Sequence, residues 1–132
     1  MNERILVIED DPGALRLAQY VLQYEGYEVL TATNGLAGLK KARSEQLDLV
    51  ILDVMLPGVD GFEICHRLRA EPQTAQLPIL MLSAKAQAVD LAMGLKVGAD
   101  DYLSKPTDAA EIIRRVKKLL AGKAKPRSQK VA

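Results

Sequence analysis

Short runs of apolar residues recur along the chain, and each one ends in a polar residue or a turn. Residues 5–8, 47–52 and 77–82 are nearly continuous apolar runs, which is typical of strands that are buried on both faces of a sheet. Two shorter stretches, 27–31 and 101–104, have a similar strand-like composition. The pattern therefore predicts five strands.

Between these strands, apolar residues recur with the spacing of amphipathic helices. The predicted apolar sides are Ala14, Leu17, Ala18, Val21 and Leu22; Leu36, Leu39 and Ala42; Ile64, Cys65 and Leu68; Ala88, Leu91, Ala92 and Leu95; and Ile112, Ile113, Val116, Leu119 and Leu120. Asp11 before Pro12, and Asp108 three residues before Glu111, are typical of helix N-termini. Five strands that alternate with five helices predict an α/β domain, in which helices cover both faces of a parallel sheet.

Polar residues that could bind a ligand or react stand where four of these strands end. Glu9 and Asp10 follow the first strand, and Asp53 ends the third. Ser83 follows the fourth strand and Lys105 the fifth. Because the carboxyl ends of parallel strands meet at one edge of the sheet, where such folds place their sites, we expect these side chains to converge.

The acids at this edge predict a metal site. Burying a carboxylate costs several kcal/mol unless it is compensated, so Asp53 must be paired, metal-bound or reactive. Carboxylates that converge raise one another's pKa unless a cation lies between them. Oxygen ligands with room for water suit Mg²⁺, or the similar Mn²⁺. Taken singly, each acid is explained as a turn or helix-cap residue and Lys105 as a solvated lysine, so the argument rests on their convergence.

Composition narrows the class of protein. At 132 residues with 48% hydrophobic content, the chain fits one domain with a sizeable core. Lys and Arg number 18 against 17 Asp and Glu, so overall charge argues for neither nucleic acid nor a membrane surface as a partner. Cys65 is the single cysteine, which excludes an internal disulfide. No apolar run approaches the roughly 18 residues that span a bilayer, and we expect a soluble cytoplasmic protein.

A set of motifs in fixed order points to a family. The motifs are Glu9-Asp10; Asp53 with Met55-Leu56-Pro57-Gly58-Val59-Asp60-Gly61; Ser83-Ala84; Gly98-Ala99-Asp100-Asp101-Tyr102; and Lys105-Pro106. Together they resemble the receiver domain of two-component response regulators, over residues 4–121. The resemblance implies a doubly wound, flavodoxin-like (βα)5 fold with strand order 2-1-3-4-5. We expect a receiver domain at 1–121, followed at 122–132 by a basic flexible tail or the start of a linker.

The resemblance also implies a metal-dependent reaction. Asp53 would accept a phosphoryl group from a phosphohistidine on a sensor histidine kinase or a phosphotransfer protein. Asp10, Asp53 and the backbone carbonyl of Met55 would bind Mg²⁺ or Mn²⁺ directly, and Glu9 would bind it through water. Lys105 and Ser83 would contact the phosphoryl oxygens. This activity belongs to a signalling protein rather than to an enzyme that turns over a substrate.

Further residues acquire roles from the same resemblance. The Lys105–Pro106 bond is a candidate cis peptide that aims the lysine inward. Met55 and Lys85 stand at positions that modulate hydrolysis of the acyl phosphate, and an apolar Met55 predicts slow self-dephosphorylation. Ser83 and Tyr102 form the expected switch, which would change the surface made by the fourth helix, fifth strand and fifth helix.

The partners expected from this surface are proteins. The Ala99–Tyr102 segment with Glu111 and Arg115 resembles receivers of winged-helix transcription factors, which dimerise through this face. Leu91 stands where that branch usually has a basic residue. The chain carries no recognisable effector domain, so we expect no direct contact with nucleic acid or membrane. It is either a stand-alone regulator or the receiver of a longer protein.

Three alternatives stay open on the residues. A degenerate receiver would work by binding alone, without phosphorylation. A small-molecule aspartyl phosphohydrolase would place a second acid two residues after its nucleophile, where this chain has Met55. An FMN binder on the same architecture would need a phosphate-binding loop rich in Ser, Thr and Gly, where this chain has Glu9-Asp10-Asp11-Pro12.

Overall fold

The computed structural model describes residues 2–84, 88–105 and 107–123, which form alternating strands and helices. In chain order these are β1 (Arg4–Ile8), α1 (Pro12–Tyr24), β2 (Glu28–Ala32), α2 (Gly35–Ser44), β3 (Leu49–Asp53), α3 (Gly61–Ala70), β4 (Ile79–Ser83), α4 (Ala88–Lys96), β5 (Asp101–Ser104) and α5 (Ala109–Lys123). The predicted alternation of five strands with five helices is confirmed. The last helix extends two residues past the predicted boundary at 121, and positions 124–132 of the predicted tail lie outside the described residues.

The five strands form one parallel sheet in the order β2-β1-β3-β4-β5, which confirms the predicted topology. Ile8 of β1 lies opposite Leu52 of β3, so the residues that follow them leave the sheet at the same level. The strand order reverses at this pair, because β2 lies on one side of β1 and β4 on the far side of β3. Parallel sheets of this kind carry their sites at such a switch point.

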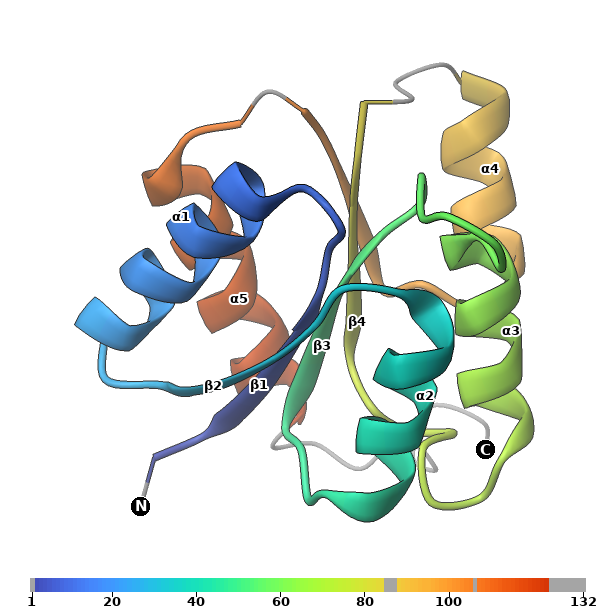
Figure 1. Ribbon diagram of the computed structural model, residues 1–132, viewed down its shortest axis with the longest axis horizontal. Helices are drawn as coiled ribbons and strands as arrows, with labels where there is room; N and C mark the ends of the chain where they lie inside the picture. The colour runs from blue at the N-terminus through green and yellow to red at the C-terminus, as the bar shows by residue number, and fades with distance from the viewer. Residues whose placement is uncertain (1, 85–87, 106, 124–132) are drawn as a thin grey trace.

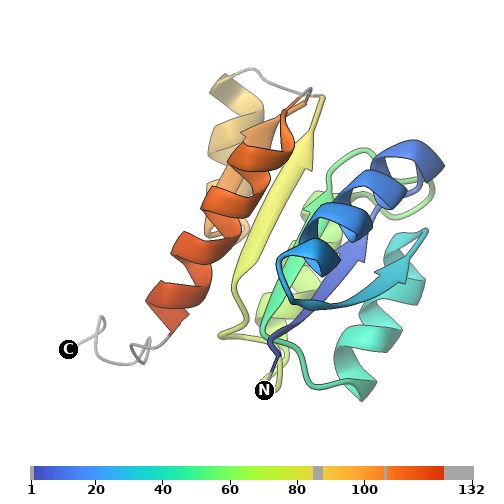
Figure 2. The ribbon, with the colours of Figure 1, turned by 90° about the vertical axis from the view of Figure 1, so that its left-hand side faces the viewer.

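Helices cover both faces of the sheet, α1 and α5 on one side and α2, α3 and α4 on the other (Figure 1, Figure 2). The two faces have separate apolar clusters because successive residues of a strand point to opposite sides. In β3, Val50 and Leu52 pack in the cluster under α2 and α3, whereas Leu49 and Ile51 pack in the cluster under α1 and α5. All four are fully buried, as the continuous apolar pattern predicted.

Polar side chains cap the helices where the sequence indicated. Asp11 accepts a hydrogen bond from the Ala14 N–H at 2.8 Å and begins α1. Asp108 accepts one from the Glu111 N–H at 2.8 Å ahead of α5. The Glu111 carboxylate itself binds arginines of the same helix. Both predicted N-caps are confirmed.

Several members of the predicted apolar sides are exposed. Leu17, Leu36 and Leu95 expose 49%, 56% and 54% of their surface. In α2 the closest approach to the sheet is made by a glycine, because a Cβ at Gly38 would lie 2.8 Å from Cγ1 of Ile8. The buried side of α2 comprises Gly35, Gly38, Leu39 and Ala42, and Leu36 lies outside it.

Within the described part of the chain, no helix is long and apolar enough to cross a membrane.

Candidate functional site

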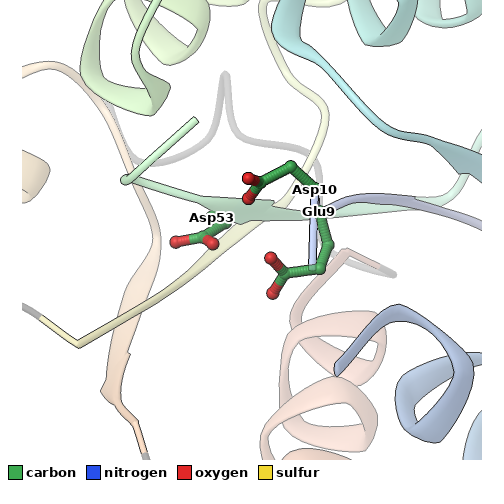
Figure 3. Close-up of side chains that lie close together, drawn as sticks. All are labelled: Glu9, Asp10 and Asp53. Carbon is green, nitrogen blue, oxygen red and sulfur yellow. The ribbon is translucent and has the colours of Figure 1, made fainter. Parts of the chain in front are cut away.

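Three carboxylates meet beyond the carboxyl ends of β1 and β3. Oxygen atoms of Glu9, Asp10 and Asp53 lie within 4.8 Å of one another, and Figure 3 shows the three side chains converging. Asp53 and Glu9 are buried, whereas Asp10 is exposed. The predicted convergence of these acids is therefore confirmed as geometry.

Asp53 is held by the backbone on both sides of the turn that follows β3. Its carboxylate accepts a hydrogen bond from the Met55 N–H at 3.1 Å. Behind it, Gly61 begins α3 so close to the strand that a Cβ there would lie 2.7 Å from the Val54 Cα and would also contact the Asp53 carbonyl oxygen. The turn and the helix start thus fix the position of the acid.

Lys105 enters the site from the end of β5. Its ammonium group lies 3.2 Å from Oδ2 of Asp53 and also forms an ion pair with Oε1 of Glu9. Its backbone N–H donates to the Ser83 carbonyl at 2.7 Å, which joins the ends of β4 and β5. A cation therefore already lies between two of the acids.

Burial and the neighbouring charges shift the pKa values of Glu9 and Lys105. Burial raises the pKa of Glu9 and the hydrogen bond with Asp53 raises it further, while Lys105 works in the opposite direction. Burial opposes the charge of Lys105, but its bond to Glu9 and the charge of Asp53 outweigh that cost and raise the pKa of Lys105. Among the described residues, this pocket has one ammonium group for three acids and is short of positive charge.

The donor set fits a hard divalent cation. Three carboxylates supply oxygen ligands within reach of one centre, and exposed Asp10 leaves a side open to water. The second oxygen of Glu9 accepts the Asp11 N–H at 3.1 Å, which orients that side chain. Met55 reaches Asp53 through its N–H, and ligation by its carbonyl stays a prediction.

Comparison with known proteins identifies the family. The model of the response regulator receiver domain matches residues 5–117. The chain belongs to this family. Among relatives of this receiver, the alkaline phosphatase synthesis transcriptional regulatory protein PhoP of Bacillus subtilis is 48% identical over 120 residues, which is 91% of this chain and 49% of that protein.

The DNA-binding dual master transcriptional regulator RpaA of Synechocystis is also 48% identical, over 89% of this chain and 48% of that protein. The receiver thus spans about half the length of the curated relatives it matches. The family match favours a receiver over the phosphohydrolase and FMN-binding alternatives.

Solved structures have the same fold. A putative response regulator from Chloroflexus aurantiacus superposes with a TM-score of 0.88 at 39% identity, over 92% of this chain and 99% of that one. The receiver domain of a sensor histidine kinase from Pseudomonas aeruginosa has a TM-score of 0.85 at 29% identity, with the same coverage. That structure has a magnesium ion coordinated in the active site cleft.

The remaining predicted residues fall into two groups. Ser83 is fully buried at the end of β4, and Tyr102 of β5 is buried with 8% of its surface exposed. Burial raises the pKa of Tyr102, and a side-chain hydrogen bond with Ser83 acts in the opposite direction. Lys85 and Pro106, and with them the predicted cis peptide, lie outside the described residues.

Two features of the site escaped the sequence analysis. Gly61 could have been suspected, since an Asp-Gly pair at a helix start after an acidic strand end indicates close backbone approach. The second feature is a largely apolar cavity of about 350 Å³ between α1 and α5, which reaches Asp53 and Lys105. Its walls come from β1, β3, β4, α1, α5 and the loops beside them, and no single motif marks them.

Proposed function

We propose that this receiver accepts a phosphoryl group on Asp53 from the phosphohistidine of a sensor histidine kinase or phosphotransfer protein. The observation that carries the proposal is a buried carboxylate with a lysine ammonium 3.2 Å away and two further acids beside it. We assign this role to a receiver at 1–121, with 122–132 as a tail or linker. Direct nucleic-acid contact is not part of the proposal.

In the transfer, a carboxylate oxygen of Asp53 forms the new P–O bond as the N–P bond of the donor breaks. The loose transition state leaves the protein to position the groups and neutralise the charge on the phosphoryl oxygens. Bound Mg²⁺, or Mn²⁺, would supply much of that neutralisation. Asp10, Asp53 and the Met55 carbonyl would hold the ion directly, and Glu9 would act through water.

Lys105 and Ser83 take the other oxygens. The Lys105 ammonium already lies beside the Asp53 carboxylate, so a short displacement brings it to a group bound there. Ser83, one residue beyond the Leu82 that pairs with Asp53, offers its hydroxyl as a donor. A donated bond from Ser83 to the phosphoryl group would compete with its contact to Tyr102 and carry the signal to β5.

The output surface comprises α4, β5 and α5. On it, Arg115 of α5 binds Asp101 at 2.8 Å and Glu111 at 2.9 Å, which ties β5 to α5. We propose that phosphorylation changes the affinity of this face for a partner, an output domain or a second receiver. Sedimentation with and without a phosphoryl mimic tests the homodimer, because an unchanged mass on activation removes it.

The residue at 55 would set the lifetime of the signal. The Met55 side chain is apolar and half exposed beside Asp53, so it offers no hydrogen bond to orient an attacking water. Self-dephosphorylation is therefore slow, and Met55→Asn accelerates it. An unchanged rate in that variant contradicts the role, and Lys85 is the second position expected to affect this rate.

The function is tested by intact mass after incubation with Mg²⁺ and acetyl phosphate. We expect a gain of one phosphoryl group that disappears in Asp53→Asn and in the presence of a chelator. Asp60→Asn is the matched control, since Asp60 is an exposed acid near the same turn and asparagine still caps α3. A folded protein that gains no mass is a degenerate receiver, and the proposal fails.

A further inference from the structure

The expected switch couples Ser83 to the ring of Tyr102. In that expectation, Ser83 moves toward the phosphoryl group and vacates the space that Tyr102 then fills. Here Tyr102 is only 8% exposed and Ser83 is still beside it. The space for the ring must therefore come from another residue.

That residue is Gly94 in α4. A Cβ added at Gly94 would lie 2.9 Å from Cδ2 and 3.3 Å from Cε2 of the Tyr102 ring, and 3.2 Å from the Met81 sulfur. Real Cβ atoms essentially never approach this closely, so one side must move. Because glycine has no side chain, position 94 leaves the space in which the ring lies.

The same contact attaches the helix. Of the α4 side chains that the structure describes, residues 90–96, Gly94 alone is buried, while Leu91, Met93 and Leu95 are exposed. Figure 1 places α4 at the edge of its layer, next to α3. Among residues 90–96 of α4, Gly94 is therefore the position that lies closest against the Tyr102 ring.

We propose that Gly94 is a positioning residue that holds the ring of Tyr102 inward beneath α4. Its role in signalling rests on the proposed function, but the packing does not. A side chain at 94 shifts the ring outward, because the ring can rotate about its side-chain torsions while the strand backbone cannot move.

Tyrosine nitration by tetranitromethane, located by peptide mass, tests the packing in the unmodified chain. Tyr20 and Tyr24 are 66% and 80% exposed and serve as internal standards. In the parent chain Tyr102 reacts far more slowly than these two. In Gly94→Ala we expect Tyr102 to react at least about tenfold faster, whereas the control Gly122→Ala, which has nothing within 4 Å of its Cβ position, leaves it protected. Continued protection of Tyr102 in folded Gly94→Ala overturns the proposal.

Thermal unfolding supplies a second test that does not depend on Gly94→Ala folding. Alanine is a better helix former than glycine, so the effect of Gly94→Ala on the Tm should change sign once the clash with the ring is removed. We expect Gly94→Ala to lower the Tm in the presence of Tyr102 and to raise it in a Tyr102→Ala background. A fall in Tm of similar size in both backgrounds overturns the proposal. Phosphorylation by acetyl phosphate is measured separately, and its failure in the parent chain would refute the proposed function and leave the packing result standing.

Discussion

Helices α3 and α4 lie side by side on one face of the sheet, yet they are attached to it in opposite ways (Figure 1). Helix α3 inserts Ile64, Cys65 and Leu68, each fully buried, into the cluster over β3 and β4. Within its described residues 90–96, helix α4 meets the sheet through the backbone of Gly94 and exposes its leucines. Burial of apolar side chains is the main source of stability, so α3 is firmly held, whereas residues 90–96 of α4 contribute little stability of this kind.

The difference matches the place of each helix in the proposed reaction. Helix α3 begins against the turn that carries Asp53, where a displacement of even one ångström would alter the phosphorylation geometry. Helix α4 belongs to the proposed output surface, which must exist in two arrangements of similar free energy. Firm attachment suits the first role and weak attachment suits the second.

Truncating one leucine on each helix is the most direct test of this difference between α3 and α4. Leu68→Ala should lower the free energy of unfolding by about 2–5 kcal/mol, because it leaves a cavity in the core. Leu95→Ala, at a side chain 54% exposed, should change it by no more than about 0.5 kcal/mol. Urea unfolding measures both. Equal losses would show that α4 is as firmly packed as α3.

A thiol on each helix gives a kinetic version of the comparison. Burial raises the pKa of the Cys65 thiol from its ordinary value of 9.0 to about 11, so at pH 8 its thiolate fraction is about a hundredfold below that of an ordinary thiol. In Leu95→Cys, iodoacetamide should label the new thiol rapidly and Cys65 only at higher pH or in denaturant. Peptide mass spectrometry separates the two sites, and equal rates would contradict the comparison.

Gly61 lies against rigid strand backbone, whereas Gly94 lies against a side chain that can move. Gly61→Ala places a methyl group against strand backbone and should cost about 1–3 kcal/mol of unfolding free energy, with slower phosphorylation of Asp53. Gly94→Ala meets a side-chain ring that can rotate away, so it should cost less. Urea unfolding and intact mass measure the two effects. A larger loss from Gly94→Ala would reverse the assignment of rigidity.

The smallest expected effect concerns the start of α3. The Asp60 carboxylate accepts the Glu63 N–H at 3.0 Å and caps the helix. Asp60→Ala should cost about 1 kcal/mol, whereas Asp60→Asn should be nearly neutral because asparagine caps equally well. The difference between their urea midpoints isolates the cap, and equal midpoints would show that the cap adds nothing to the hold on α3.

The convergence of the site residues could be predicted because parallel strands leave little freedom. Once β1, β3, β4 and β5 are recognised as neighbours, Asp53, Ser83 and Lys105 must emerge at one edge. The pairing of Lys105 with Glu9 was not predicted, since it depends on side-chain torsions that strand spacing does not determine. The chemical roles of these residues stay proposals, supported by family membership and geometry.

Predictions about the helices succeeded or failed for a different reason. Periodicity identifies the apolar side of a helix, and Ile64, Cys65 and Leu68 are buried as a set. It does not tell how close the helix lies to the sheet. Where glycine makes a close approach, as in α2 and α4, some leucines of the predicted apolar side, such as Leu36 and Leu95, are left in solvent, although Leu39 is buried. Close approach depends on atoms from distant segments, which no local pattern contains.

Arg69 joins α3 to the chain segments that precede β4 and follow α4. From α3 its guanidinium donates to the carbonyl oxygens of Ala75 and Leu77 ahead of β4 and of Gly98 just after α4, and it binds the Asp100 carboxylate at 2.8 Å. One side chain therefore clamps the chain where α4 ends and β5 is about to begin. If α4 shifts, its clamped end moves least, and the displacement is greatest at the opposite end of the helix, nearest the site.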